Sequence, residues 1–143
     1  MPRVNRRGAF QRPKVGQNGA TEMATYPWVI LEIDGLWRVY TKAATQHFLK
    51  RAGYYAQARE CDGVFGYWSQ LALQKWLKYG PGSNLSGYSG LLDGKAGDMT
   101  WEALANRIAL YGHYNPPLPW PKGMDPNTIA FCKGIQRWLN DSR

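Results

Sequence analysis

The sequence predicts an all-α protein, a small bundle of short helices joined by Asp-Gly turns, preceded by an extended basic N-terminal arm. The first observation behind this prediction is a repeat. Asp-Gly pairs begin at residues 34, 62 and 93, and each is followed by a segment with the same pattern of small and apolar residues. The second observation is that these segments run to glycines at residues 53, 80 and 112, where a helix is expected to end in a left-handed C-cap. Repetition at this spacing indicates a series of equivalent structural units.

Residues 1–25 are expected to form the arm, because they show neither a helical nor a strand period. Five basic residues lie here against Glu22 alone, which gives +4 of the total formal charge of +8. They are Arg3, Arg6, Arg7, Arg12 and Lys14. Such an arm suits an acidic partner, either nucleic acid or an acidic protein surface, and a solubilising tail is the alternative.

The folded body is expected to span residues 26–143 and to contain four units, near 29–53, 54–80, 88–112 and 120–140. When the Asp-Gly pairs are aligned, Ala44, Ala72 and Ala103 coincide, so one position of each helix is always small and allows close packing. The fourth copy has Gly134 there, but its turn at 122–125 has lost the Asp-Gly pair. The expected helices are 40–52, 67–79, 99–111 and 126–140, after a short apolar segment at 29–31 that is either a strand or a buried extended stretch.

The Asp-Gly pairs are predicted to be structural, because aspartate accepts hydrogen bonds from backbone N–H groups in a tight turn and glycine tolerates a positive φ. The turn residues are Asp34, Gly35, Asp62, Gly63, Asp93 and Gly94. Asp98 is predicted to cap the third of these helices. Asp125 and Pro126 are predicted to begin the fourth.

Two connections are longer than the others. Residues 81–90 are rich in glycine and serine and are predicted to form a flexible loop. Residues 114–124 carry four prolines around Trp120 and are predicted to form a polyproline-like strap that Trp120 pins to the body.

The central copy resembles a known family. The similar residues are 49–55, 62–66 and 72–77, which look like the peptidoglycan-binding domain. The pattern of that domain begins with a leucine-bearing helix and a Gly-Tyr pair. An Asp-Gly-x-Phe/Trp-Gly turn follows, and then a helix with an Ala-x-x-x-Phe/Trp seam. Residues 34–37 are similar to the Asp-Gly-x-Trp-Gly repeats of actinobacterial and phage cell-wall proteins. The resemblance covers 29–112, and 120–140 more weakly. It departs from the family at Arg38, where the family has glycine, and at Ala96, where it has an aromatic residue. The resemblance implies a helical fold that binds peptidoglycan.

A glycan ligand is expected to stack on aromatic side chains, because sugar rings present C–H faces to them. The candidates flank the central turn and are Tyr54, Tyr55, Tyr67 and Trp68. The alternative is that Trp68 and one of the tyrosines are core residues, since aromatic residues at helical spacing usually pack.

No catalytic, metal or cofactor site is predicted. Three of the ten acidic residues are the turn aspartates, and Glu60 beside Asp62 does not form the separated pair that glycosidases need. Cys61 and Cys132 are distant in sequence from each other and from the two histidines, without the spacing of a metal site. We therefore expect a non-catalytic protein with free thiols that are at least partly buried, Cys61 in the core.

The sequence contains no run of roughly 18 or more consecutive apolar residues, the length that a membrane span needs. An export signal would have an apolar segment after its basic start, and no such segment follows here. Together with the basic arm and the resemblance of the repeats to those of phage cell-wall proteins, this leads us to expect a phage virion protein, assembled in the host cytoplasm. It would be a minor capsid, decoration or tail-associated component that contacts other virion proteins through the arm and aids attachment to the host cell wall. A free peptidoglycan-binding module or lysin accessory is the alternative. A nucleic-acid-binding protein that uses the arm is the third hypothesis.

Overall fold

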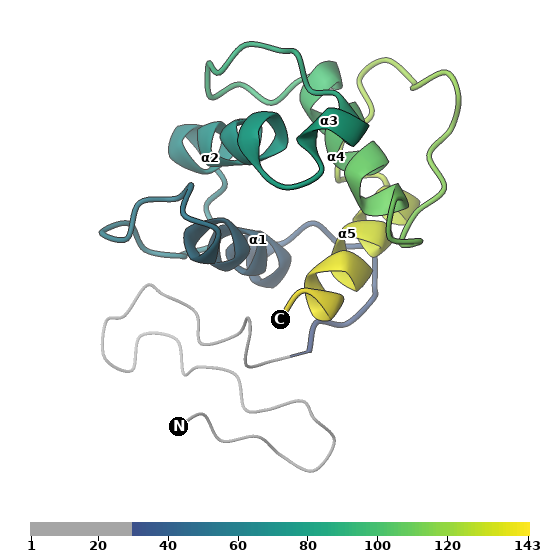
Figure 1. Cartoon of the computed structure of the whole chain (residues 1–143). Coiled ribbons are helices and arrows are strands. Elements are labelled where there is room, and N and C mark those ends of the chain that lie inside the picture. The colour runs from purple at the N-terminus through teal and green to yellow at the C-terminus, as the bar shows by residue number, and fades with distance from the viewer. Residues whose placement is uncertain (1–29) are drawn as a thin grey trace.

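The structure is a computed structural model that describes residues 30–143, and over this range the fold is all-α, as predicted. The predicted arm, 1–25, lies outside the described residues. The helices are α1 (Val39–Arg51), α2 (Tyr67–Tyr79), the single-turn α3 (Ser83–Ser86), α4 (Asp98–Ala109) and α5 (Ile129–Asp141) (Figure 1). The predicted positions of α1, α2 and α4 are confirmed to within two residues at each end.

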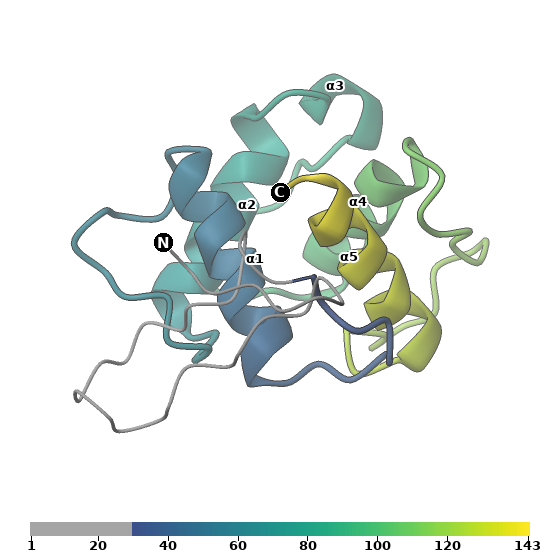
Figure 2. The ribbon, with the colours of Figure 1, turned by 90° about the horizontal axis from the view of Figure 1, so that it is seen from below.

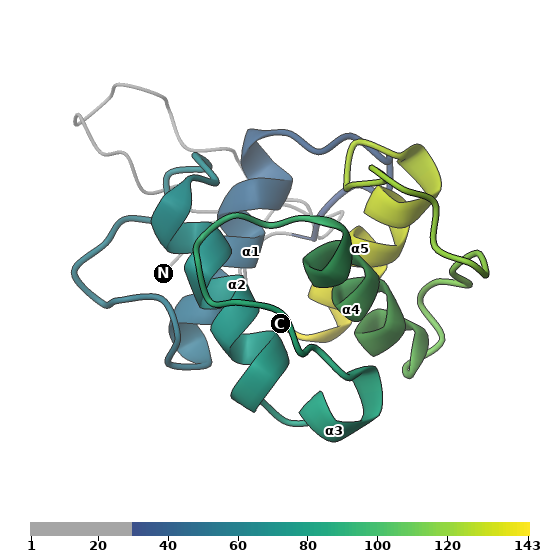
Figure 3. The ribbon, with the colours of Figure 1, turned by 90° about the horizontal axis from the view of Figure 1, so that it is seen from above.

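The four long helices form a closed ring. Helix α1 packs against α2, α2 against α4, α4 against α5, and α5 against α1, so the last helix meets the first. Helix α3 packs against α2 and α4. Figures 2 and 3 show the four long helices placed around a common centre, with α3 on the outside. The ring gives every long helix two neighbours against which to bury its apolar side.

Each Asp-Gly turn has the same geometry. In the first turn, Oδ1 of Asp34 accepts a hydrogen bond from the N–H of Leu36 at 3.0 Å, and Gly35 has a φ of +74°. A Cβ added to Gly35 would also lie 2.5 Å from Cγ2 of Ile129, the first residue of α5. The turns at 62–64 and 93–95 repeat these features against the first residues of α1 and α2. Glycine is therefore required both by the backbone conformation and by the close approach of a helix.

A buried glutamine of a neighbouring helix holds each Asp-Gly turn. In the second turn, Oε1 of Gln46 accepts a hydrogen bond from the N–H of Gly63 at 2.8 Å. Its Nε2 donates to the carbonyl of Val64 at 2.9 Å and to Oγ of Ser69 at 2.8 Å. One amide side chain thus satisfies polar groups of the turn and of the helix that follows it.

The same clamp recurs at the other two Asp-Gly turns. Oε1 of Gln74, in α2, accepts from the N–H of Gly94 at 2.8 Å. Oε1 of Gln136, in α5, accepts from the N–H of Gly35 at 2.9 Å. The ring is therefore closed by the contact that also joins its successive units.

The contact between α4 and the fourth turn lacks both partners of this clamp. Helix α4 has Ala105 where the other long helices have glutamine, and the fourth turn has no Asp-Gly pair. Instead, Oδ1 of Asp98 accepts a hydrogen bond from the N–H of Gly123 at 2.8 Å. The prediction that Asp98 caps α4 is wrong: Asp98 is the first residue of the helix, Gly97 is the N-cap, and no side-chain capping bond forms. The Asp98 carboxylate serves the neighbouring turn instead.

Each of the four long helices contributes one side chain, from equivalent positions, to the centre of the ring. These side chains are Phe48, Trp76, Arg107 and Trp138. The ring of Phe48 lies 5.1 Å from that of Trp76 and 4.6 Å from that of Trp138. The guanidinium of the fully buried Arg107 lies 4.3 Å from the centroid of Trp76. It donates to the carbonyl groups of Leu77 at 2.9 Å and Pro81 at 2.7 Å. Burial lowers the pKa of Arg107 from its usual value.

The left-handed C-cap conformation expected at the three glycines after these helices is confirmed at two of them. Gly53 and Gly112 have φ values of +91° and +78° and follow the last turns of α1 and α4. Helix α2 does end at Gly80, as predicted, but the left-handed conformation expected there is wrong, because its φ of −75° and ψ of 173° are extended. Glycine is needed there for space, since a Cβ on Gly80 would lie 2.6 Å from Cδ1 of Trp76.

The predicted start of α5 is also wrong. The helix begins at Ile129 instead of residue 126. The N–H of Thr128 donates to the carbonyl of Asp125 at 2.9 Å, and Oδ1 of Asp125 accepts from the N–H of Asn127 at 2.8 Å. Asp125 and Pro126 therefore form a tight turn before the helix.

The connections are more ordered than the sequence suggested. The predicted loop at 81–90 contains α3. Trp120 packs edge-on against Phe131, with ring centroids 5.4 Å apart, so it does attach the proline-rich strap to the body. At the start of the described chain, Leu31 is buried outside any helix or strand, and its N–H and carbonyl bind the side-chain amide of Asn140 at 2.8 and 3.0 Å.

Candidate functional site

The four aromatic candidates separate into buried and exposed residues. Tyr55 is only 6% exposed, and its hydroxyl donates to the carbonyl of Glu60 at 3.0 Å, so it belongs to the core. Burial raises the pKa of Tyr55. Tyr54 is half-buried and packs against the same core. Tyr67 and Trp68 are each 50% exposed.

Tyr67 and Trp68 form one surface feature, which we call the aromatic platform. They are the first two residues of α2, and their rings meet edge to face with centroids 4.8 Å apart. The ring of Tyr67 also lies against Gly94, where an added Cβ would overlap it. The third turn therefore supports one side of the platform, while half of each aromatic side chain stays accessible.

Arg59 completes the platform. It lies in the loop between α1 and the second turn, and its guanidinium is 4.3 Å from the ring centroid of Trp68. A guanidinium has five N–H donors. Because Arg59 is exposed, these donors are available at the edge of the aromatic surface. Arg59 was not predicted from the sequence, because only the folded loop brings it back over Trp68.

The fold does not require two aromatic residues at the start of a helix. Equivalent positions begin the other long helices, with Val39-Tyr40, Asp98-Met99 and Ile129-Ala130. At the first position, Val39 and Ile129 support a turn glycine just as Tyr67 does. At the second position, tryptophan, tyrosine, methionine and alanine all occur within one ring. The exposed indole of Trp68 is therefore not explained by packing of the repeat.

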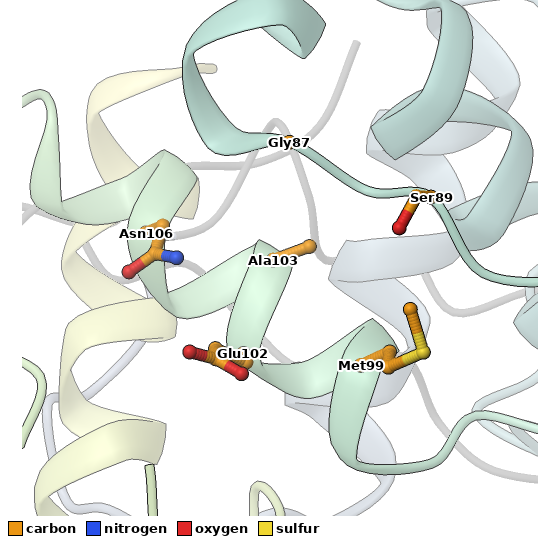
Figure 4. A pocket seen from close by; sticks show the side chains of 6 residues that line it. All are labelled: Gly87, Ser89, Met99, Glu102, Ala103 and Asn106. Carbon is orange, nitrogen blue, oxygen red and sulfur yellow. The ribbon is translucent and has the colours of Figure 1, made fainter. Parts of the chain in front are cut away.

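A cavity of about 420 Å³ opens at the centre of the ring, beside Phe48, Trp76 and Trp138. Its polar rim includes His113 and Asp141, whose Nε2 and Oδ2 atoms are 3.2 Å apart. A smaller cavity of about 180 Å³ lies between α4 and the segment after α3 (Figure 4). Glu102 is the one titratable side chain among the residues that line the smaller cavity, so that cavity offers no pair of acid and base groups.

Cys61 and Cys132 are both buried, as predicted, and neither forms a disulfide bond. Burial raises the pKa of Cys132 to about 12, which keeps this thiol protonated and unreactive. In the described part of the chain, no three His, Cys, Asp or Glu side chains are grouped so that they would bind a metal ion.

The remaining predicted residues have different outcomes. The turn aspartates and glycines occupy the clamped turns described above, where their polar groups are engaged with the protein itself. The basic residues of the arm lie outside the described residues. Between residues 30 and 143, no helix is both long enough and apolar enough to cross a membrane.

The comparisons with known proteins add no relative. No protein-family model matches the chain, and no match is found among the curated proteins or the solved structures.

Proposed function

We propose that this protein is a non-catalytic component of a phage particle that binds the glycan of the bacterial cell wall through its aromatic platform. The observation that carries the proposal is the pairing of Tyr67 and Trp68 on the surface beside Arg59. The other long helices of the ring have no pair of aromatic residues at the equivalent positions. The resemblance of the central repeat to the peptidoglycan-binding domain supports the choice of ligand.

The chemistry of the platform suits an acidic glycan. The C–H faces of a sugar ring stack on the indole of Trp68 and on the phenol of Tyr67. The guanidinium of Arg59 donates hydrogen bonds to a carboxylate of the same ligand, which peptidoglycan carries. Because the clamped turns on both sides of α2 fix the start of that helix, little conformational freedom is lost on binding.

Binding to purified cell walls tests the ligand. The protein should co-sediment with peptidoglycan, and replacement of both Tyr67 and Trp68 by alanine should reduce retention at least tenfold. Tyr79→Ala is the matched control, because Tyr79 is a 60% exposed aromatic residue at the other end of α2. Retention of the double variant at the level of the Tyr79→Ala control would exclude the platform as the binding site.

The location in a particle is supported by the sequence, through the dense positive charge of residues 1–25 and the similarity of the repeats to those of phage cell-wall proteins. We expect mass spectrometry of purified particles to detect the protein. Deletion of 1–25 should abolish its incorporation while the far-UV circular dichroism of the helical body is unchanged. Absence of the full-length protein from the particles would refute this part of the proposal.

A further inference from the structure

The outer side of α2 combines aromatic rings with positive charge. Trp68, Lys75 and Tyr79 follow one another at intervals of seven and four residues, which places them on one side of the helix. Lys78 lies beside them, three residues after Lys75. Trp68 and Tyr79 are 50% and 60% exposed, Lys78 is exposed and Lys75 is half-buried. We call these four residues the α2 stripe.

The α2 stripe is positively charged. Helix α2 contains no acidic residue, and neither does α1, which packs against it. In the part of the chain that the structure describes, Lys75 and Lys78 form no ion pair or hydrogen bond, so both ammonium groups are available. The guanidinium of Arg59 adds a third positive charge at the Trp68 end. The loops that flank α2 hold Glu60 and two aspartates, and both aspartates are bound in the clamped turns. The stripe therefore favours an anionic ligand.

The packing of the ring does not require the α2 stripe. Helix α4 belongs to the same ring and has Ala103 where α2 has Ala72. In that alignment the four corresponding residues include no cation and no aromatic ring, and they are Met99, Asn106, Ala109 and Leu110. The aromatic rings and lysines on the outside of α2 are therefore a property of that helix and not of the repeat.

From this arrangement we propose that the α2 stripe binds single-stranded nucleic acid without sequence preference. Two bases stack on the rings of Trp68 and Tyr79, and the phosphates between them contact Lys75 and Lys78. Trp68 keeps half of its surface exposed with the guanidinium of Arg59 in place, so the indole is open to a base. The two rings are 11 residues apart, which is about 16 Å along the helix, and a strand of several nucleotides spans that distance.

This site belongs to the folded body, whereas the sequence indicated nucleic-acid binding only through the arm. It does not rest on the proposed function, although Trp68 belongs to both surfaces. Lys75, Lys78 and Tyr79 lie outside the aromatic platform, so variants of these three residues distinguish nucleic-acid binding from glycan binding.

A pair of oligonucleotides separates stacking from charge. Fluorescence anisotropy measures the affinity of the full chain for an oligothymidylate of about 12 nucleotides and for an abasic strand with the same number of phosphates. The basic arm meets the same phosphates in both strands, so a difference in affinity reports contacts to the bases. We expect the abasic strand to bind at least tenfold more weakly. Equal affinities would overturn the proposal and would indicate a surface for anionic polymers of any kind.

Tyr79→Ala tests the second stacking position. It should lower the affinity for oligothymidylate at least fivefold and leave the affinity for the abasic strand unchanged, because only the first strand has a base to stack. Retention of this variant on purified peptidoglycan should equal that of the unchanged protein, since Tyr79 is not part of the aromatic platform. An unchanged affinity for oligothymidylate would contradict the proposal.

The two lysines are tested by the dependence of binding on salt. Each contact with a phosphate of a single strand contributes about 0.7 to the slope of log affinity against log salt concentration. The double variant Lys75→Gln with Lys78→Gln should therefore lower the slope by about 1.4. The control is Lys122→Gln with Lys133→Gln, which removes the same charge from the strap and from α5, in the fourth unit of the ring. Equal slopes for the two double variants would refute the assignment.

Discussion

At the scale of single residues, the fold depends on three buried glutamines. The amide of Gln74 accepts hydrogen bonds from the N–H groups of Asp93 and Gly94 at 3.1 and 2.8 Å, and donates to the carbonyl of Lys95 at 3.1 Å. All these partners belong to one turn, so a single substitution leaves several polar groups without a hydrogen bond.

We predict that Gln74→Ala lowers the free energy of unfolding by about 1–3 kcal/mol, because a buried donor or acceptor without a partner costs that much. Urea denaturation followed by tryptophan fluorescence measures the change. Gln57→Ala is the control, since Gln57 is exposed and makes one hydrogen bond, to the carbonyl of Lys50. Equal effects of the two substitutions would show that the clamp contributes little.

The aspartate of a clamped turn gives a pH dependence with a definite sign. Hydrogen bonds from Gln136 and from the N–H of Leu36 lower the pKa of Asp34 in the folded protein. This stabilisation is present above the unfolded pKa of about 3.9 and is lost as the pH falls through the lower folded pKa. The free energy of unfolding of Asp34→Asn should therefore fall less between neutral and strongly acidic pH than that of the unchanged protein, as measured by urea unfolding. An acid dependence identical to that of the unchanged protein would argue against this linkage.

At the scale of elements, the sequence predicted the bounds of a helix best where the repeat pattern and a glycine indicated the same boundary. The bounds predicted for α2 match the structure, because the Asp-Gly turn marks the approach to it and Gly80 follows it. The start of α5 was misplaced because Asp-Pro begins both helices and tight turns, and here it forms a turn. The α3 turn was missed because its four residues are too few for a periodic signal.

The turn glycines allow a matched prediction. Gly63 has a φ of +79°, and a Cβ there would overlap Val39, whereas Gly66 has a φ of −93° and nothing within 4 Å of an added Cβ. Gly63→Ala should cost about 1–3 kcal/mol of stability. Gly66→Ala should cost less than about 1 kcal/mol, because alanine is only a poorer helix cap. Thermal unfolding of the two variants measures the difference, and a larger loss for Gly66→Ala would contradict the geometry.

The candidate site was only partly predictable. Tyr67 and Trp68 were two of the four candidates chosen for their position near the central turn. The alternative that Trp68 is a core residue is wrong, because Trp68 is 50% exposed. Tyr55 was not recognised as a core residue, because it lies in a loop where no helical period reports burial. The approach of Arg59 to Trp68 depends on the path of that loop, and so does not follow from sequence spacing.

At the scale of the whole molecule, the ring is closed by contacts between residues about one hundred positions apart, such as Gln136 with Gly35. If the ring is one cooperative unit, the amides of Gly35, Gly63 and Gly94 exchange with solvent only when the whole ring unfolds. We predict equal free energies of hydrogen exchange for the three amides, measured by NMR. Faster exchange of Gly35 alone would show that the ring opens first between α5 and the first turn.

The central functional claim is that cell-wall glycan binds at the aromatic platform. Titration with soluble peptidoglycan fragments, monitored by the indole N–H resonances of the tryptophans, tests it most directly. We predict that the Trp68 resonance shifts in a saturable way, while those of Trp76 and Trp138 in the central cavity stay in place. Absence of any shift at Trp68, or a shift confined to Trp76 and Trp138, would contradict it.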